Sequence, residues 1–434
     1  SVAATITKAT LTATANNDAK FVTQADAANF AGVSYAGFVN GETDAVLGGT
    51  LTVTRSNAAT NSAGEYPGVL GASGLTSGNY DIQYQAGDFT IVPSNQLLVR
   101  VTDISNTYGT ATQYAITSVE YEQSGTVVVL GTGGASGSSV NIDANNEVTI
   151  QDGAGGIATF TVVPDSAQTS GAGLLAVGSY QLDAASITTQ NAKNFSNTIT
   201  VTGSQQVNAK AVSASAANVS KVYDGTNLMT DVALDLTGLE TGDAVTVDGL
   251  GEFSQKNVGT GLSYTVFNLS LSDADAGNYY LSSGASFTGN DGEITARTLT
   301  LHYTGQNKVY DGNATATVTV TDNRVAGDVL TFNPTASFSD KNVETNKTVS
   351  ITNVTMGGAD AGNYTLASTT GSTTADITRL NSVTWTGNGD GLSWFDPDNW
   401  ANGAVPDLSN VANVVIPSGM SESFDTARVV SPAD

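Results

Sequence analysis

The side chains available for catalysis are few, and their types leave little room for the common enzyme mechanisms. The chain of 434 residues contains no cysteine and a single histidine, His302, which lies in the alternating segment Leu299-Thr300-Leu301-His302-Tyr303. Ser-His-Asp and Cys-His nucleophilic sites and histidine-based metal sites are therefore not expected. Paired carboxylates of the kind used in glycoside hydrolysis would still be possible, but no aspartate pair stands apart from repeated turn positions. We predict that the protein is not an enzyme.

Three tryptophans near the C-terminus have the residue types and neighbours of a carbohydrate site. They fall within sixteen residues, in the pattern W-x-G…W-x-D-P-x-N-W followed by Val405-Pro406. Tryptophan rings stack on the faces of sugars, and adjacent amides can bond the sugar hydroxyls. The alternative is that the rings form the core of a further module, and their spacings of nine and six residues favour this interpretation. The candidate ligand residues are Trp385, Trp394, Trp400 and Asn399.

Calcium is the cation that an acidic, asparagine-rich chain would bind, because it takes oxygen ligands from carboxylates, amides and the backbone. Two loops carry candidate carboxylates, although neither completes the spacing of an EF-hand. The alternative, which the sequence favours, is that these acids lie in ordinary solvated turns. The candidate ligands are Asp273 and Asp275 in one loop, and Asp390, Asp396 and Asp398 in the other.

Four short sequences occur twice in the second half of the chain, in the same order. The first pair is offset by 87 residues and the other three by 85, which indicates two copies of one module that differ by a short deletion. The pairs are Lys221-Val222-Tyr223-Asp224-Gly225 and Lys308-Val309-Tyr310-Asp311-Gly312, Gly242-Asp243 and Gly327-Asp328, residues 253–258 and 338–343 (F-S-x-K-N-V), and residues 274–279 and 359–364 (A-D-A-G-N-Y).

The repeated sequences are typical of turns that position core residues. Gly225 and Gly312 would supply the positive φ of a tight turn, while Asp224 and Asp311 would bond back to the backbone. Tyr223 and Tyr310 would anchor the preceding strand. Tyr279 and Tyr364 would bury their rings and bond a backbone group, as in the tyrosine corner of immunoglobulin-like sandwiches. Because all these positions recur with the structural period, we interpret them as structural rather than catalytic.

Composition agrees with a β-rich protein of acidic character. Alternating segments such as Phe89-Thr90-Ile91-Val92 predict half-buried strands, and helical periodicity is nearly absent. The formal net charge of −25 argues against nucleic acid or an anionic membrane surface as a partner. No apolar run approaches the length of about 20 residues that a membrane-spanning helix requires.

The four repeated sequences resemble the YDG-type module of large bacterial surface exoproteins. Gly41-Glu42-Thr43-Asp44 and Ser77-Gly78-Asn79-Tyr80 resemble the related MBG module of the YGX type. Such modules occur in filamentous-haemagglutinin-like adhesins of two-partner secretion and in biofilm-matrix adhesins. The resemblance implies a secreted protein located at the bacterial surface or in the extracellular matrix. It predicts an MBG module at residues 1–94, a divergent MBG-like module at 95–212, YDG modules at 213–297 and 298–380, and the Trp-rich start of another β module at 381–434.

The predicted fold is an all-β tandem array of immunoglobulin-like sandwiches or β-grasp-like modules that forms an extended rod. The predicted function is a non-catalytic stalk of an adhesin, with attachment to extracellular polysaccharide or neighbouring cells through flanking domains. Two alternatives remain open. One is a carbohydrate-binding array that acts through the Trp-rich end, and the other is a calcium-dependent protein that self-associates into a surface layer or fibre. We refer to the five predicted segments as modules one to four and the Trp-rich segment.

Overall fold

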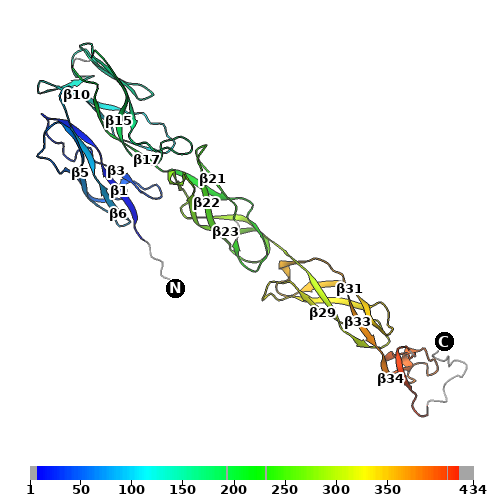
Figure 1. Cartoon of the computed structure of the whole chain (residues 1–434). Helices are drawn as coiled ribbons and strands as arrows, with labels where there is room; N and C mark the ends of the chain where they lie inside the picture. Colours follow the sequence, from blue (N-terminus) through cyan, green and yellow to red (C-terminus); the bar gives the residue numbers. More distant parts are fainter. Residues whose placement is uncertain (1–6, 192–193, 230–231, 408, 420–434) are drawn as a thin grey trace. The chain divides into compact units, whose positions relative to one another are not determined.

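The computed structural model describes residues 7–191, 194–229, 232–407 and 409–419 (Figure 1). In these residues the secondary structure consists of β-strands and five short 3-10 helices, with no α-helix. The chain is organised as two compact units. Unit 1 contains Ser1–Ala217, Asp231–Leu250 and Val266–Phe287, and unit 2 contains Asn218–Thr230, Gly251–Thr265 and Thr288–Asp434.

Module one is built from two sheets, with strand orders β3-β1-β6 and β2-β7-β5-β4. Its core joins Ala15 of the first sheet to Val53, Leu70, Phe89 and Ile91 of the second, and all five side chains are buried. The elements are β1 (Ala9–Ala15), β2 (Asp18–Phe21), β3 (Val33–Ala36), η1 (Asp44–Val46), β4 (Gly48–Arg55), β5 (Gly64–Thr76), β6 (Tyr80–Gln85) and β7 (Gly87–Val92).

Module two has a larger core between a four-stranded sheet, β11-β10-β8-β16, and a six-stranded sheet, β12-β13-β14-β15-β17-β9. Val99, Val148, Ile150 and Phe160 are completely or almost completely buried in it. The elements are β8 (Leu97–Val101), β9 (Ile104–Thr107), β10 (Ile116–Gln123), β11 (Thr126–Leu130), β12 (Ser138–Ile142), β13 (Glu147–Asp152), β14 (Ile157–Pro164), β15 (Gly178–Gln190), β16 (Ile199–Thr202) and β17 (Ser204–Asn208).

Module three contributes residues to both units. The sheet β21-β18-β24 belongs to unit 1, and the residues of the sheet β19-β25-β23-β22-β20 are divided between the units. The elements are β18 (Lys210–Ala216), β19 (Ser220–Val222), β20 (Leu228–Met229), β21 (Leu234–Thr237), β22 (Thr246–Phe253), β23 (Gly259–Ser272), η2 (Ala276–Asn278), β24 (Tyr279–Leu281) and β25 (Ser286–Thr295).

Module four and the Trp-rich segment lie in unit 2 and share one core cluster, which includes Tyr310, Val349, Trp385 and Trp400. The sheets are β26-β32, β27-β29, β28-β33-β31-β30 and β34-β35. The elements are β26 (Arg297–Leu299), β27 (Leu301–Gly305), β28 (Lys308–Val309), β29 (Val318–Asp322), β30 (Thr331–Phe338), β31 (Glu344–Gly357), η3 (Ala361–Asn363), β32 (Tyr364–Leu366), β33 (Gly371–Thr378), β34 (Leu380–Thr384), η4 (Pro397–Asn399), η5 (Ala401–Gly403) and β35 (Val411–Val415).

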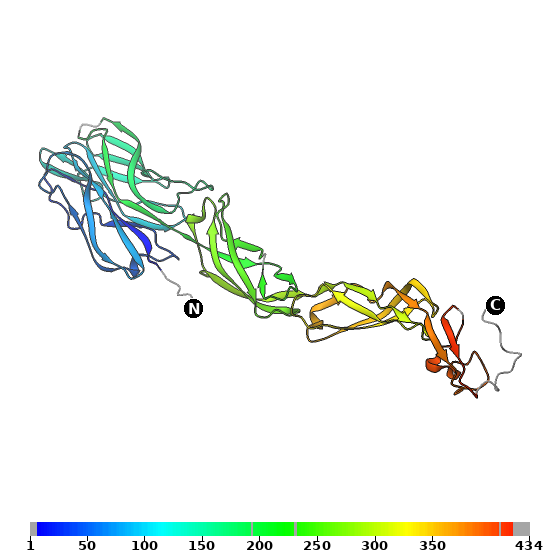
Figure 2. The same ribbon diagram turned by 60° about the horizontal axis from the view of Figure 1, so that its bottom comes forward.

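Each module begins with a strand that is divided into parts, two of which pair in parallel with parts of the closing strand. The pairs are β1 with β6 and β2 with β7, β8 with β16 and β9 with β17, β18 with β24 and β19 with β25, and β26 with β32 and β28 with β33. The remaining strands pair mostly as antiparallel neighbours, and the layers can be followed in Figures 1 and 2. The all-β prediction is confirmed, and the sandwich rather than the β-grasp alternative describes the modules.

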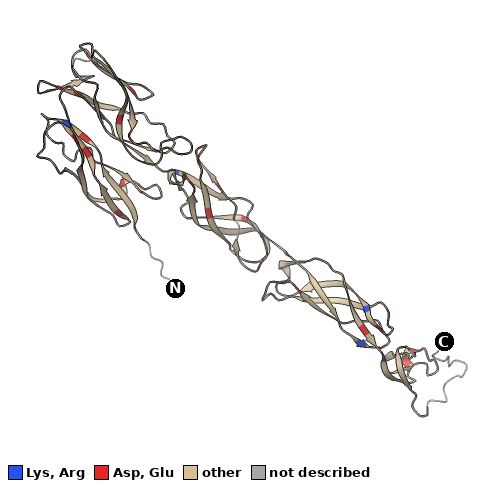
Figure 3. Cartoon of the chain, viewed as in Figure 1, with Lys and Arg blue, Asp and Glu red and all other residues tan. Residues whose placement is uncertain are grey.

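Strand patterning explains why these residues form sandwiches. Along β31, Lys347, Val349 and Ile351 are buried while Thr348 and Ser350 are exposed, so that one face of the strand packs on the core. Figure 3 shows Asp and Glu distributed over the strands and loops of both units. Among the residues whose structure is described, no helix is long and apolar enough to cross a bilayer.

Candidate functional site

The repeated sequences meet where one module follows another, and the first such joint lies between modules two and three. The hydroxyls of Tyr108 and Tyr279 both donate to Oδ2 of Asp243, at 2.5 and 2.6 Å. The two rings contact edge to face, with centroids 5.3 Å apart. The other carboxylate oxygen of Asp243 accepts the backbone N–H of Ala172 at 2.8 Å. One aspartate therefore links a tyrosine of its own module to a tyrosine and a loop of the preceding module.

The second joint repeats this geometry between modules three and four, entirely within unit 2. The hydroxyls of Tyr223 and Tyr364 donate to Oδ2 of Asp328 at 2.9 and 2.5 Å. Their ring centroids are 5.5 Å apart at an interplanar angle of 77°. Tyr223 belongs to the Tyr-Asp-Gly sequence of module three, whereas Asp328 and Tyr364 come from the Gly-Asp and Asn-Tyr sequences of module four. The sequences that repeat along the chain are thus the two halves of one joint.

The second tyrosine of each joint also holds the turn that carries the aspartate. The hydroxyl of Tyr279 accepts the backbone N–H of Glu240, and that of Tyr364 accepts the N–H of Val325, each at 2.9 Å. This backbone bond is the one predicted by analogy with the tyrosine corner. The donation to aspartate was not predicted, because the Gly-Asp sequence was interpreted only as a turn.

Electrostatics favours two neutral tyrosines in each joint. Burial raises the pKa of the Tyr108 hydroxyl to about 12, and the bond to Asp243 adds to this shift. The pKa values of Tyr279, Tyr223 and Tyr364 are raised for the same two reasons. Burial alone would raise the pKa of Asp243, but the bonds that it accepts from Tyr108, Tyr279, Ser170 and the backbone of Ala172 together outweigh burial and lower it. Each hydroxyl therefore keeps its proton for the carboxylate at neutral pH.

An asparagine makes a second connection across the same two joints. Oδ1 of Asn278 accepts the N–H of Val177 from module two at 2.8 Å. Oδ1 of Asn363 accepts the N–H of Val258 from module three at 2.9 Å, and its Nδ2 donates to Oδ1 of Asn257. Asn278 and Asn363 are only 6% and 5% exposed. The Lys-Asn-Val and Gly-Asn-Tyr sequences therefore repeat because they bond each other across a joint.

The Tyr-Asp-Gly turn has the predicted backbone geometry, and a lysine that was not singled out completes it. Gly225 and Gly312 have φ angles of 84° and 82°, in the left-handed region that favours glycine. Asp224 accepts the N–H of Thr226 at 2.9 Å. The ammonium of Lys221 bonds Asp224 at 2.7 Å and also the carbonyls of Thr226 and Leu228. Lys308 and Asp311 form the same ion pair at 2.7 Å.

The Trp-rich segment contacts module four as a following module would. The hydroxyl of Tyr310 donates to the carbonyl of Val405 at 3.1 Å. Oδ1 of Asn410 accepts the N–H of Val343 at 2.7 Å, and its Nδ2 donates to Asn342, as in the asparagine connection above. Among the described residues of this contact, a backbone carbonyl takes the place of the carboxylate as the acceptor of the tyrosine hydroxyl.

The tryptophans form a core, which contradicts the sugar-binding prediction for most of the predicted residues. Trp385 and Trp400 are 1% and 2% exposed, and their rings contact edge to face at 4.9 Å. Trp394 is half-buried against Trp400, and its Nε1 donates to the carbonyl of Pro406. Asn399 is completely buried. Because a sugar can stack only on an accessible ring face, Trp385, Trp400 and Asn399 are not available as ligand residues.

Asn399 is the hydrogen-bonding centre of the loop that was also predicted to bind calcium. Its Oδ1 accepts the N–H groups of Gly389 and Gly391, and its Nδ2 donates to Oδ1 of Asp390 at 2.6 Å. Asp396 accepts the N–H groups of Asp390 and Asp398 on its two oxygens. The carboxylates of Asp390 and Asp396 therefore close the loop by bonding its amides.

The two residues of the other predicted calcium pair, Asp273 and Asp275, have different structural roles. Asp275 is buried, and its two oxygens accept the N–H groups of Gly171 and Ala244 at 3.0 and 2.8 Å. It is therefore part of the first joint, whereas Asp273 is an exposed turn residue with a φ of 79°. Across the described ranges no group of three or more His, Cys, Asp or Glu side chains is placed to hold a metal ion. Neither predicted loop gathers such a group among these residues, and both calcium sites stay predictions.

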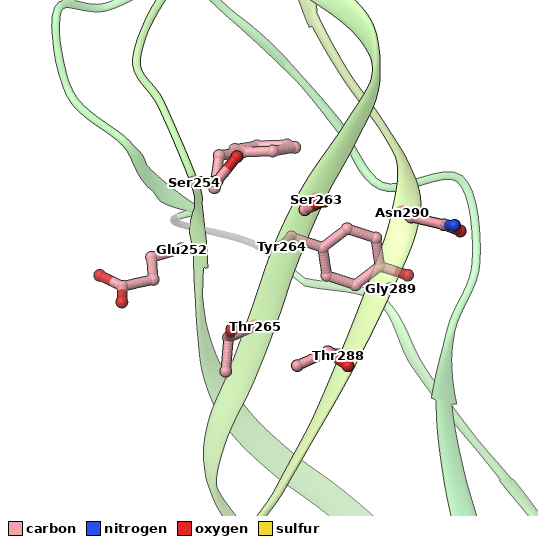
Figure 4. A pocket seen from close by; sticks show the side chains of 9 residues that line it. Glu252, Ser254, Ser263, Tyr264, Thr265, Thr288, Gly289 and Asn290 are labelled. Carbon is pink, nitrogen blue, oxygen red and sulfur yellow. The ribbon is translucent and has the colours of Figure 1, made fainter.

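A shallow groove of about 450 Å³ lies on the exposed face of β22, β23 and β25 (Figure 4). Small polar side chains line it, together with Glu252. Tyr264 projects from β23 toward Gly289, where a Cβ atom would lie only 2.2 Å from the tyrosine Cζ, and the tyrosine is buried. The groove thus offers neither an accessible aromatic face nor paired acids for chemistry.

Comparison with known families identifies most of the modules. Residues 208–286 and 295–388 match the YDG domain, and residues 11–90 match the MBG domain of the YGX type. The chain therefore contains YDG and MBG repeat modules. The matched YDG ranges include Tyr223, Asp328 and Tyr364 of the second joint. A comparison with curated proteins found no match for the chain.

Proposed function

We propose that this chain is a non-catalytic, load-bearing spacer of a secreted bacterial adhesin at the cell surface or in the biofilm matrix. Flanking domains would attach to extracellular polysaccharide or to neighbouring cells. The observation that carries the proposal is the tyrosine–aspartate–tyrosine joint, because the residues that repeat along the chain are used to connect modules rather than to form a reaction site.

The strand order of the modules supports a role under tension. The first strand pairs in parallel with the last strand, as in β26 with β32 and β28 with β33. When the ends of such a module are pulled apart, the hydrogen bonds between these strands are loaded together in shear rather than opened one after another. Resistance of this kind depends on the unfolding barrier and not only on equilibrium stability.

Single-molecule stretching of the whole chain tests this proposal. We expect separate unfolding events, of which those of modules three and four each release roughly 290 Å of chain, from 85 residues per repeat at about 3.4 Å per residue. Removing the shared acceptors with Asp243→Ala and Asp328→Ala should lower the force of events that involve the joints. A featureless extension at low force would contradict a load-bearing role, and turnover in a screen of glycoside and peptide substrates would contradict a non-catalytic one.

A further inference from the structure

A cleft of about 790 Å³ lies in unit 1, where residues of modules one, two and three come together. Its volume falls within the range of roughly 300–1,000 Å³ that is typical of ligand sites. Module one contributes the loop that follows β3, module two contributes the ends of β9, β15 and β17, and module three contributes the end of β23 and β24. A second cleft of about 330 Å³ shares Tyr35, Phe38, Thr43, Gln206 and Asn208 with it. The two clefts therefore adjoin each other.

Three half-buried aromatic side chains line the larger cleft. Tyr35 and Phe38 contact each other with ring centroids 5.5 Å apart. Tyr280 rests on Gly41, where a Cβ atom would lie 2.7 Å from the tyrosine Cζ. These rings are not used by the joints, in which Tyr279 rather than Tyr280 bonds Asp243. They are therefore the aromatic surface that the buried tryptophans of the C-terminal segment cannot provide.

Polar groups with unused bonding capacity surround the rings. Within the described residues, no hydrogen bond involves the side chains of Asn40, Thr43 or Ser270, all three of which are exposed. Glu42 accepts the hydroxyl of Tyr80 on one carboxylate oxygen, which leaves the other for a donor in the cleft. Aromatic faces beside amides, hydroxyls and a carboxylate are the combination that binds sugar rings.

The charge of the lining selects among possible ligands. Glu42, Asp44 and Asp103 line the two clefts, and neither set of described lining residues includes lysine, arginine or histidine. An anionic polysaccharide would meet three carboxylates with no cation to compensate. The exposed polar side chains of the lining fit a chain of sugars better than a compact apolar molecule.

We propose that this cleft binds a segment of a neutral polysaccharide, with Phe38 and Tyr280 as stacking platforms and Glu42 and Asn40 as hydrogen-bonding groups. This binding does not depend on the spacer role, because it uses residues that take no part in the joints. It would give the chain a direct contact with matrix glycan in addition to whatever its flanking domains bind.

Calorimetric titration of the whole chain with neutral gluco-, manno- and galacto-oligosaccharides tests the proposal. We expect at least one of them to bind to the natural chain. In Tyr280→Ala the affinity for that sugar should fall by roughly tenfold, or about 1.4 kcal/mol. Tyr280→Phe should bind like the natural chain, since it keeps the ring. Asn40→Gly removes the amide and tolerates the φ of 53° at this position, so it gives a second loss that does not depend on packing. Phe395→Ala is the matched control, because Phe395 is 66% exposed in unit 2 and far along the chain.

Three results would overturn the assignment. The first is the absence of binding to every neutral oligosaccharide, and the second is equal loss in Phe395→Ala and Tyr280→Ala. The third is binding of a uronic-acid oligosaccharide or a lysine-rich peptide that is stronger than binding of the neutral sugars. The acidic lining should repel the uronic acids, and it would attract a lysine-rich peptide through charge alone. Stretching of Tyr280→Ala separates the two proposals, because its joints are intact and its unfolding forces should equal those of the natural chain.

Discussion

At the residue scale, the most consequential side chain is an aspartate that serves two tyrosines from different modules. Asp328 is half-buried and accepts both Tyr223 and Tyr364. Asp328→Ala would leave two largely buried hydroxyls without their acceptor, so we expect a loss of about 2–3 kcal/mol in the free energy of unfolding. Tyr223→Phe removes one bond together with its donor and should cost about 1 kcal/mol. Urea unfolding followed by circular dichroism measures both, and Asp235→Ala, at an exposed position of β21, is the control.

The same residues set the response of the fold to alkaline pH. Tyr108 has a pKa of about 12, and those of Tyr223, Tyr279 and Tyr364 are also raised above that of an unfolded tyrosine, near 10. A raised pKa means that the folded state holds the proton more tightly. The corresponding stability is therefore complete below about pH 10 and is lost as pH rises through the folded pKa.

A spectrophotometric titration of the tyrosines checks this expectation. We expect the joint tyrosines to ionise only as the β-sheet signal disappears, later than the more exposed members of the fifteen tyrosines. Ionisation of all tyrosines as one group near pH 10, with the sheet signal intact, would be incompatible with buried joints. On the acid side the lowered pKa of Asp243 predicts the opposite sign, with stability lost as pH falls below about 4.

At the scale of elements, each joint depends on a short 3-10 turn that presents an asparagine to the strand end of the preceding module. Asn363 ends η3 and accepts the N–H of Val258. Asn363→Ala would leave this partly buried N–H unpaired, with an expected cost of about 1–2 kcal/mol. Hydrogen exchange should show faster exchange of the Val258 amide. Asn79, at the same position of module one, is exposed and bonds nothing through its side chain in the described residues, so Asn79→Ala should change little.

The Trp-rich segment is a second element whose stability can be tested. Asn399→Ala would remove two acceptor and two donor bonds inside a closed loop, and we expect a local loss of roughly 3 kcal/mol or more. Tryptophan fluorescence should shift to the red as Trp385 and Trp400 become hydrated. If soluble sugars quenched this fluorescence in the natural chain, our conclusion that these rings form a core would have to be withdrawn.

Sequence reasoning predicted the elements better than the contacts between them. Alternation identified strands such as β7, and the repeated turns identified modules, because both signals are local. The role of Asp243 and Asn278 was missed because their partners, Tyr108 and Val177, are 135 and 101 residues away in the sequence. The spacing of the repeats shows that two short sequences recur together. It does not show that one of them contacts the other sequence of the next module.

The candidate ligand residues also show that a local sequence pattern does not determine which side chains are buried. Tryptophan, asparagine and aspartate in one short segment suit either a sugar site or a small core, and only the burial of Asn399 and Trp385 separates the two. The proposed glycan cleft had no sequence signal, since Phe38 and Tyr280 come from different modules and neither lies in a recognisable motif.

At the scale of the whole molecule, joints that use the same residues should let modules be exchanged. Deleting residues 223–309, which are 87 residues, joins Val222 directly to Tyr310. The first strands of module three would then pair with the closing strands of module four, because β19 and β28 have equivalent parallel partners in β25 and β33. Tyr108 of module two would meet Asp328 and Tyr364 in place of Asp243 and Tyr279.

We therefore expect the shortened chain to fold cooperatively, and Asp328→Ala within it to destabilise the joint to module two by about 2–3 kcal/mol. A deletion of the same length that runs from Tyr180 to Val266 joins strands of unlike modules and should not fold. Circular dichroism and urea unfolding of the two variants make the comparison. If both fold equally well, the register of the repeat does not matter to the structure. If neither folds, the joints are specific to each pair of modules, and the array cannot be lengthened or shortened by whole repeats as a spacer requires.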